Sequence, residues 1–152
     1  MGRVLDVAMG NGENAVYLAG MGFEVKGVDI STEAVKNALV LAHVAQVSIT
    51  ASVADLEKNY HIDKDSYDVI ICFNYLQRSL IQQIKDGIRP GGIVVYETFT
   101  VDQARFGKPK NPDHLLERNE LLNFFREFRC LHYHEGIFEV RRAVAGILAE
   151  KP

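Results

Sequence analysis

Two aspartates and two glycines near the start of the chain have the types and spacing of a nucleotide pocket. Asp6 lies in the apolar run of residues 4–9, and Gly10 and Gly12 follow that run directly. Glycine lets the chain turn tightly without placing a Cβ in a ligand's way. Asp29 ends a second apolar run, where a carboxylate can accept hydrogen bonds from both hydroxyls of a ribose. The four residues predict a nucleotide-binding turn flanked by two carboxylates.

A strand, a helix and a second strand must position these groups. Apolar residues around Asp6 predict a buried parallel strand, residues 14–19 predict a helix, and residues 23–28 predict the second strand. The first N–H groups of that helix point into the crevice between the two strand ends. Asn14, at the start of the helix, either contacts the ligand there or simply caps the helix.

Asp6 bears on which nucleotide is bound. Gly10, Gly12 and Ala15 also satisfy the loose dinucleotide fingerprint G-x-G-x-x-G/A. A carboxylate just ahead of the glycines would repel the pyrophosphate of a dinucleotide, because like charges disfavour each other. A ligand with a cationic amino group and no phosphate suits the position better, and S-adenosylmethionine (SAM) is such a ligand.

Strands and helices alternate along most of the remaining chain, which predicts a parallel sheet covered on both faces. The last two strand-like runs are separated by only seven residues, too few for a helical crossover, so they should pair antiparallel. The expected helices are Ser31 to about Ala45, 80–88 and 111–125, and the expected strands are 47–54, 67–73, 93–99, 128–135 and 143–150.

The block from Leu5 to Ala19, LDxAxGxGxNAxxLA, resembles class I SAM-dependent methyltransferases, in particular small bacterial ones of the tellurite-resistance type. The resemblance covers the whole chain. It implies an α/β fold with a Rossmann-like, seven-stranded, mostly parallel sheet in the order 3-2-1-4-5-7-6, strand seven antiparallel, and helices on both faces. A dinucleotide-binding domain lacks that antiparallel strand. Ala8 replaces the first glycine of the commoner DxGxGxG pattern.

The helices that usually precede the first strand of this family are missing from the sequence. In the family these helices close over the cofactor and shape the acceptor pocket. A truncated chain, a fragment and a lid supplied by a partner subunit are three alternatives that the sequence leaves open.

The resemblance assigns one group of residues to the methionine part of SAM. Positions matching Asp6, Ala8, Gly10 and Gly12 surround that part in the family. A backbone oxygen near Phe73 is expected to reach the amino group of the ligand.

A second group is assigned to the nucleoside part. The residue matching Asp29 holds the ribose, and the one matching Asp55, at the end of the third strand, lies at the adenine. Ile30 and Leu56 are expected to sandwich the adenine ring between apolar surfaces.

The acceptor-side candidates follow the fourth and fifth strands, where this fold places residues nearest the transferring methyl group. Tyr75, Arg78 and Glu97 occupy these positions. The structural alternatives are core packing for Tyr75, a surface ion pair for Arg78 and a loop cap for Glu97. If the acceptor must lose a proton, Tyr75 or Glu97 is the expected base.

Composition limits the class of protein and its partners. The 152 residues, 47% hydrophobic and 24% charged, indicate one domain over residues 1–152. We find neither a run of about 18 apolar residues nor the pattern of a signal peptide, so we expect a cytoplasmic protein without membrane contact. Cys72 and Cys130 lack metal-site spacing, and no metal is expected. The oligomeric state is left open.

Charge is distributed unevenly along the chain. Residues 1–77 carry 5 basic and 10 acidic side chains, and residues 78–152 carry 12 and 10. The basic residues near the acceptor side, including Arg78, Arg105, Lys108 and Lys110, favour an anionic small molecule. A concentrated basic face is missing, which argues against a nucleic-acid partner.

The resulting hypothesis is a SAM-dependent methyltransferase that moves a methyl group to a small-molecule acceptor by in-line displacement and releases S-adenosylhomocysteine. A SAM-binding module without activity of its own is the first alternative, and an NAD-dependent oxidoreductase is the second.

Overall fold

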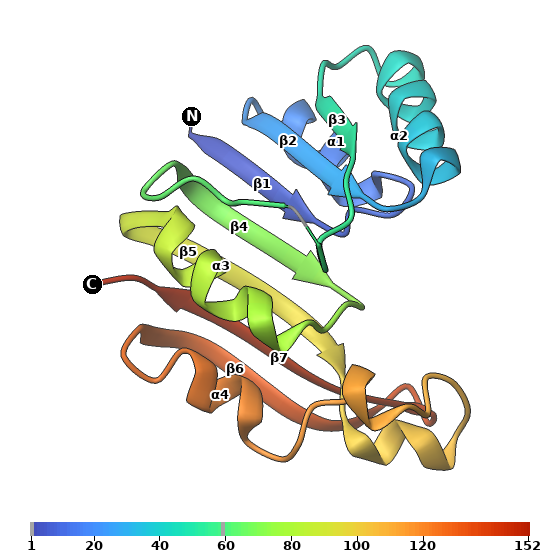
Figure 1. Cartoon of the computed structure of the whole chain (residues 1–152), viewed down its shortest axis with the longest axis vertical. Helices are drawn as coiled ribbons and strands as arrows, with labels where there is room; N and C mark the ends of the chain where they lie inside the picture. The colour runs from blue at the N-terminus through green and yellow to red at the C-terminus, as the bar shows by residue number, and fades with distance from the viewer. Residues whose placement is uncertain (1, 59) are drawn as a thin grey trace.

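The computed structural model describes residues 2–58 and 60–152. Its centre is a seven-stranded sheet in the order β3-β2-β1-β4-β5-β7-β6 (Figure 1). Neighbouring strands from β3 to β5 run parallel, and β7 runs antiparallel to both β5 and β6. The predicted fold class is therefore confirmed, including the antiparallel last strand.

The strands are β1 (Arg3–Val7), β2 (Glu24–Asp29), β3 (Thr50–Val53), β4 (Tyr67–Phe73), β5 (Ile88–Phe99), β6 (Arg129–Phe138) and β7 (Arg142–Glu150). The helices are α1 (Glu13–Gly20), α2 (Thr32–Val44), α3 (Ile81–Gly87) and α4 (Glu120–Phe124). Three short 3-10 helices are η1 (Arg78–Leu80), η2 (Val101–Arg105) and η3 (Pro112–His114). Within the described ranges, every helix is too short or too polar to cross a membrane.

Apolar side chains on both faces of the sheet hold the helices in place. In Figure 1, α3 and α4 lie in front of the sheet and α1 lies behind it. On the front face, Ile84 and Phe125 pack with the strand residue Tyr96, and all three are buried. On the back face, Ala15 of α1 packs against Val4 and neighbouring strand residues. The central strands are apolar on both sides because both sides are covered.

Helix α2 begins where the sequence predicts. The Ser31 hydroxyl accepts a hydrogen bond from the Ala34 N–H at 3.1 Å, which satisfies one of the unpaired donors at the helix start. This cap fixes the chain direction immediately after Asp29, at the end of β2. The position of Asp29 is thereby tied to a local sequence signal.

The single helix predicted over residues 111–125 is wrong. The structure has η3, then an extended stretch, then the short α4. Leu115 and Leu116 are buried in the core, and the Leu116 N–H donates to the Phe99 carbonyl at 2.9 Å. Asn119 then takes a left-handed conformation with φ 64°, which interrupts any continuous helix. Burial of the two leucines, with Leu116 bonded to β5, therefore outweighs the local helical signal.

Two strand boundaries also differ from prediction. Strand β5 begins at Ile88 and not at residue 93, so it includes the Pro90–Gly92 stretch between the expected helix and strand. The Gly91 N–H donates to the Lys151 carbonyl at 2.8 Å, so the C-terminal segment pairs with this stretch and extends the strand. Strand β3 is shorter than the expected residues 47–54.

Candidate functional site

Three adjoining cavities open at the carboxyl ends of the parallel strands. We call them the glycine-turn cavity, of about 430 Å³, the Asp55 cavity, of about 220 Å³, and the Lys108 cavity, of about 720 Å³. Tyr75 lines all three, and Asn74 lines the first and the third. Ligands in neighbouring cavities would thus meet at the segment that follows β4. Open α/β sheets bind ligands at this edge.

Most predicted cofactor residues line the first two cavities. The glycine-turn cavity is lined by Asp6, Ala8, Gly10, Asn14, Asp29 and Phe73. The Asp55 cavity is lined by Ala8, Asp29, Ile30, Asp55 and Leu56. The structure therefore brings together side chains from the ends of β1, β2, β3 and β4, as the sequence leads us to expect.

Asp29 ties the glycine turn to the end of β2. One carboxylate oxygen accepts a hydrogen bond from the Gly10 N–H at 2.9 Å, and the other accepts from the Ser31 N–H at 2.9 Å. Each oxygen keeps a further lone pair for a ligand hydroxyl. Asp29 is thus held rigidly between the two cavities, where one side chain can reach a ligand that spans both.

Gly10 and Gly12 serve different purposes, although both have positive φ, 58° and 82°. A Cβ on Gly12 would lie 2.5 Å from the Ala38 Cβ, so Gly12 allows α2 to approach the turn. A Cβ on Gly10 would meet nothing within 4 Å. Gly10 lines the glycine-turn cavity, so its missing side chain leaves room for a ligand. Gly12 is not among the residues that line the three described cavities.

Alanine at these two glycines is expected to give opposite profiles. Gly12→Ala should lower the free energy of unfolding by about 2–4 kcal/mol, because backbone strain adds to the overlap with Ala38. Gly10→Ala should cost only about 1 kcal/mol of stability and should instead weaken ligand binding. Urea unfolding and calorimetric titration with S-adenosylhomocysteine measure the two effects. Equal stability losses in the two variants would contradict this division of roles.

Asp6 is a buried carboxylate whose oxygen Oδ2 has no hydrogen-bond partner among the residues that the structure describes. Burial, and secondarily the negative charge of Asp29, raise the pKa of Asp6 to about 7. A buried carboxylate without a partner is costly, and a cationic ligand group would relieve that cost. The acidic lining of the glycine-turn cavity therefore fits the ammonium group of SAM and disfavours a pyrophosphate.

The Asp55 cavity has apolar side chains and a carboxylate edge. The Asp55 carboxylate accepts a hydrogen bond from the Glu57 N–H at 2.9 Å, which fixes the turn after β3. Leu56 is buried, whereas Ile30 is 63% exposed. Ile30 and Leu56 therefore provide apolar surfaces against which the flat ring of a ligand can pack.

Tyr75 is held at the junction of the cavities by its own hydroxyl. That hydroxyl donates to the Gln77 side-chain oxygen at 2.6 Å, and Gln77 in turn donates to the Leu56 carbonyl at 3.0 Å. Burial, with smaller contributions from nearby acids such as Glu57, raises the pKa of Tyr75 to about 12. The phenol is therefore protonated at neutral pH and forms a fixed wall between the cavities.

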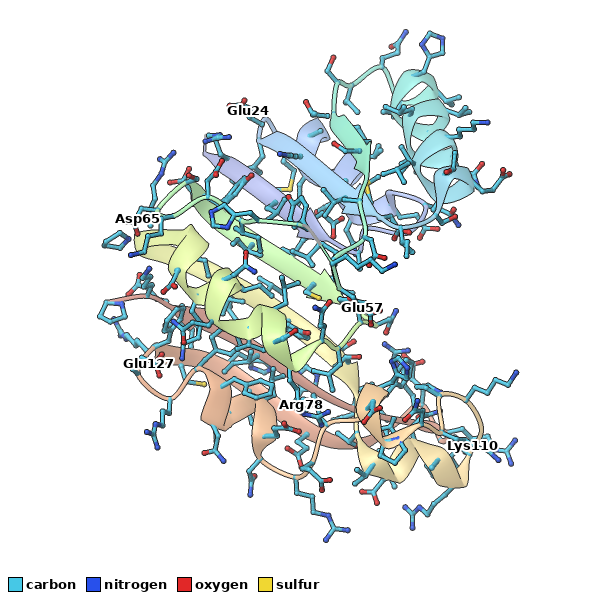
Figure 2. The ribbon with its side chains drawn as sticks, in the orientation of Figure 1. Glu24, Glu57, Asp65, Arg78, Lys110 and Glu127 are labelled. Carbon is cyan, nitrogen blue, oxygen red and sulfur yellow. The ribbon has the colours of Figure 1, made fainter. Side chains whose placement is uncertain are left out.

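Arg78 lies outside the three cavities and is fully engaged with protein groups. Its guanidinium makes a two-point ion pair with Glu120, at 2.7 and 2.9 Å, and donates to the Leu115 carbonyl at 2.8 Å. The hydrogen bond that Arg78 donates to Glu120 raises the pKa of Arg78 above its ordinary value. Figure 2 shows Arg78 near the start of α3, facing α4. These contacts favour the structural alternative, in which Arg78 links η1 to α4 through its ion pair with Glu120.

Glu97 does not line the three described cavities but is linked through a second residue to one that does. Its carboxylate is 2.8 Å from His134 Nε2 and accepts from Arg142 at 3.1 Å. Arg142 also donates to the Asn74 side-chain oxygen at 3.2 Å. Glu97 is thus linked through Arg142 to Asn74, which lies at the junction of two cavities.

Sequence reasoning did not single out Asn74, Thr98 or Phe99 as site residues, although all three line the Lys108 cavity. Asn74 has φ 57°, a conformation that turns the chain directly after β4. Asparagine tolerates this conformation better than most residues, so an asparagine after a buried strand is a usable signal. Threonine and phenylalanine are common in strands, so the sequence does not indicate that Thr98 and Phe99 line a cavity.

Comparison with known proteins supplies the family. The profile described as a methyltransferase domain matches residues 4–92, more than half of the chain. The chain belongs to the methyltransferase-domain family. The resemblance to class I SAM-dependent methyltransferases is thereby confirmed, and so, at the level of the family, is SAM as the cofactor. The matched residues contain the three carboxylates predicted to bind the cofactor, Asp6, Asp29 and Asp55, and the junction residues Asn74 and Tyr75.

Solved structures share this methyltransferase fold over nearly the whole chain. TehB from Haemophilus influenzae superposes with a TM-score of 0.82 at 20% identity, covering 99% of this chain and 58% of TehB. A SAM-dependent methyltransferase from Mesorhizobium loti gives a TM-score of 0.80 at 19% identity, covering 99% of this chain and 91% of its own. At these identities the likeness concerns the fold.

Curated relatives of the methyltransferase domain are longer than this chain. It is 28% identical over 142 residues to hemagglutinin 1 of Eikenella corrodens and covers 46% of that protein. It is 29% identical over 101 residues to a ubiquinone biosynthesis O-methyltransferase of Burkholderia ambifaria, covering 63% of this chain and 44% of that protein. The chain thus spans less than half the length of these relatives.

Proposed function

We propose that this domain transfers a methyl group from SAM to a small-molecule acceptor. The observation that carries the proposal is the buried oxygen of Asp6, a residue that lines the glycine-turn cavity, because this oxygen lacks a hydrogen-bond partner within residues 2–58 and 60–152. A cationic ligand satisfies that oxygen, and SAM combines a cationic amino group with a nucleoside. Asp29 accepts from the ribose hydroxyls, and the Asp55 cavity takes the adenine between Ile30 and Leu56.

The acceptor occupies the Lys108 cavity. This cavity shares Asn74 and Tyr75 with the glycine-turn cavity, so a molecule within it faces the cofactor across these two residues. SAM supplies a methyl group on a positively charged sulfur, which needs little more than alignment with the attacking atom. Tyr75 and Asn74 position the two reactants, and the apolar residue Leu76 excludes water.

The contacts of Tyr75 and Glu97 support roles in positioning rather than in proton transfer. Tyr75→Phe is expected to change kcat less than about threefold and to leave the pH profile unchanged, because a phenol with a pKa near 12 does not act as a base at neutral pH. Glu97→Gln should raise the acceptor KM by loosening Arg142 and Asn74, again without a new pH dependence. Steady-state kinetics between pH 6 and 9 measure both. A loss of about a hundredfold in kcat with a shifted pH profile in either variant would instead show that the substituted residue acts as a general base.

The decisive experiment for the proposed function is calorimetric titration of the chain with SAM, S-adenosylhomocysteine and NAD. Binding of SAM and S-adenosylhomocysteine, but not of NAD, supports the proposal. Binding of NAD alone would instead favour the oxidoreductase alternative. Turnover on a panel of acceptors then separates an enzyme from a binding module. Binding of SAM with no turnover on any acceptor would favour the module, which would need further protein to complete its site.

An anionic acceptor that is not a nucleic acid is part of the same proposal and comes from the charge distribution of the sequence. Acidic side chains gather in residues 1–77, which supply the cofactor side, and basic ones in residues 78–152. An acceptor assay that includes RNA and DNA fragments beside small acids tests this part directly.

A further inference from the structure

The Lys108 cavity differs in charge from the cavity it adjoins. Asp6, Glu13 and Asp29 line the glycine-turn cavity. Lys108 and Lys110 line the Lys108 cavity, and its described lining contains no aspartate or glutamate. The sign of the charge therefore reverses across Asn74 and Tyr75, the residues that the two cavities share. A negatively charged group is favoured on one side and a positively charged group on the other.

The two lysines are available to a ligand. Both are exposed, and neither makes an ion pair or a side-chain hydrogen bond with residues 2–58 or 60–152. The expectation that Arg78 would hold an anion here is not favoured, because Glu120 occupies its guanidinium. An incoming anion would thus meet Lys108 and Lys110 without first having to displace an acidic side chain of the protein.

The interior of the same cavity is mostly apolar. Leu76, Phe99 and Pro109 line it, together with Thr98, which is only 1% exposed. Its volume of about 720 Å³ lies within the range of small-molecule sites. A fully hydrated small anion such as an inorganic oxyanion would gain nothing from this apolar surface, whereas a molecule with an apolar body would bury it.

The two lysines and the junction residues Asn74 and Tyr75 lie on different segments of the chain, and the lysines do not line the two cofactor-side cavities. Asn74 and Tyr75, next to the cofactor side, directly follow β4, whereas Lys108 and Lys110 lie on the segment between η2 and η3. Figure 2 shows Lys110 on this segment, well away from Glu57, which lines the Asp55 cavity. A ligand whose charge is held by the lysines would therefore present its other end to the cofactor.

We propose that the acceptor is an elongated acid with an apolar body, held by its anionic group at Lys108 and Lys110 and methylated at the opposite end. This inference rests on the proposed function. In the transfer, a heteroatom at the remote end forms a bond to the methyl carbon while the carbon–sulfur bond breaks, and its electron pair stays on sulfur. A hydroxyl, amine or thiol acceptor releases its proton to solvent, so charge and atoms balance.

A matched pair of probes tests the charge recognition. Calorimetry with saturating S-adenosylhomocysteine compares 4-phenylbutanoate with 4-phenylbutanamide, which has the same shape and no charge. The acid should bind about 5- to 20-fold more tightly than the amide. The double variant Lys108→Gln with Lys110→Gln should remove that difference and leave the amide unchanged, because two exposed charge contacts are each worth a fewfold. The double variant Lys36→Gln with Lys64→Gln, two exposed lysines elsewhere, is the control for net charge.

Equal binding of acid and amide, a similar loss in the control variant, or no binding of the acid at millimolar concentration would each overturn charge recognition. The orientation is tested with phenylbutanoates that carry a hydroxyl, amino or thiol group at the para position, with the methylated atom located by mass spectrometry. Methylation of the para atom supports the inference. A methyl ester of the carboxylate, or no turnover of any of them, would overturn methylation at the remote end.

Failure of this inference can be told apart from failure of the proposed function. S-Adenosylhomocysteine is titrated first, without any acceptor probe. Binding of S-adenosylhomocysteine with no lysine-dependent acid binding would remove only the acceptor class. Lysine-dependent binding of the acid without binding of S-adenosylhomocysteine would remove the methyltransferase function and leave an anion-binding cavity.

Discussion

Asp29→Ala is expected to weaken S-adenosylhomocysteine binding by at least about a hundredfold. Without the carboxylate, the ribose hydroxyls would lose the acceptor of two hydrogen bonds. Each of these bonds is worth about 1.5–3 kcal/mol because the acceptor is charged. The variant also removes the acceptor of the Gly10 and Ser31 N–H groups, so the glycine turn loses its anchor to β2. Calorimetric titration of wild-type and variant chains measures the change.

Two controls separate ligand contact from loss of fold in this experiment. Asp29→Asn keeps one acceptor oxygen and should fall between wild type and alanine. Glu24→Gln, at the other end of β2 with an exposed side chain, should bind as wild type does. Near wild-type affinity in a folded Asp29→Ala chain would mean that the ribose is held elsewhere.

SAM binding is expected to weaken as the pH falls below 7, because a cationic ligand requires ionised Asp6. With the pKa of Asp6 raised to about 7 by burial and by Asp29, affinity should drop about 15-fold between pH 7 and 5.5. Asp6→Asn should bind more weakly at pH 7 and show little pH dependence. The titration stays below about pH 7.5, because free α-amino groups lose their charge near pH 8.

The stability of the ligand-free protein should change in the opposite direction with pH. The folded-state pKa of Asp6 lies above its unfolded value of 3.8, so the folded chain binds the proton more tightly. Stability from this group is therefore greatest at low pH, falls as the pH rises from about 4 to about 7, and is constant above that window. The full effect is about 4 kcal/mol.

Urea unfolding of wild type and Asp6→Asn at pH 5, 6 and 8 checks this linkage. Asp6→Asn should be more stable than wild type at pH 8, and the difference should shrink towards pH 5. Parallel curves for the two chains across this range would show that Asp6 is ionised throughout and that its oxygen has a partner in solution.

The sequence by itself determined the parts of the site that depend on neighbouring residues. The apolar residues around Asp6 require a buried strand, and Gly10 and Gly12 allow the turn that follows it. Ser31 caps the next helix and so fixes the end of the strand that carries Asp29. Each of these signals acts within a few residues, so it can be identified without knowing the rest of the fold. The antiparallel pairing of β6 and β7 followed in the same way from the short connection between them.

The tertiary structure alone decided which residues line the acceptor side. Arg78 is bound by Glu120, 42 residues away, and Glu97 reaches Asn74 through Arg142 on β7. The helix expected over residues 111–125 does not form because Leu115 and Leu116 are buried in the core, where the Leu116 N–H donates to Phe99 of β5. Partners this distant are chosen by packing, which depends on the whole chain at once. The sequence therefore determined the carboxylates of the glycine-turn cavity and the turn between them, and the packing of distant segments decided the lining of the adjoining Lys108 cavity.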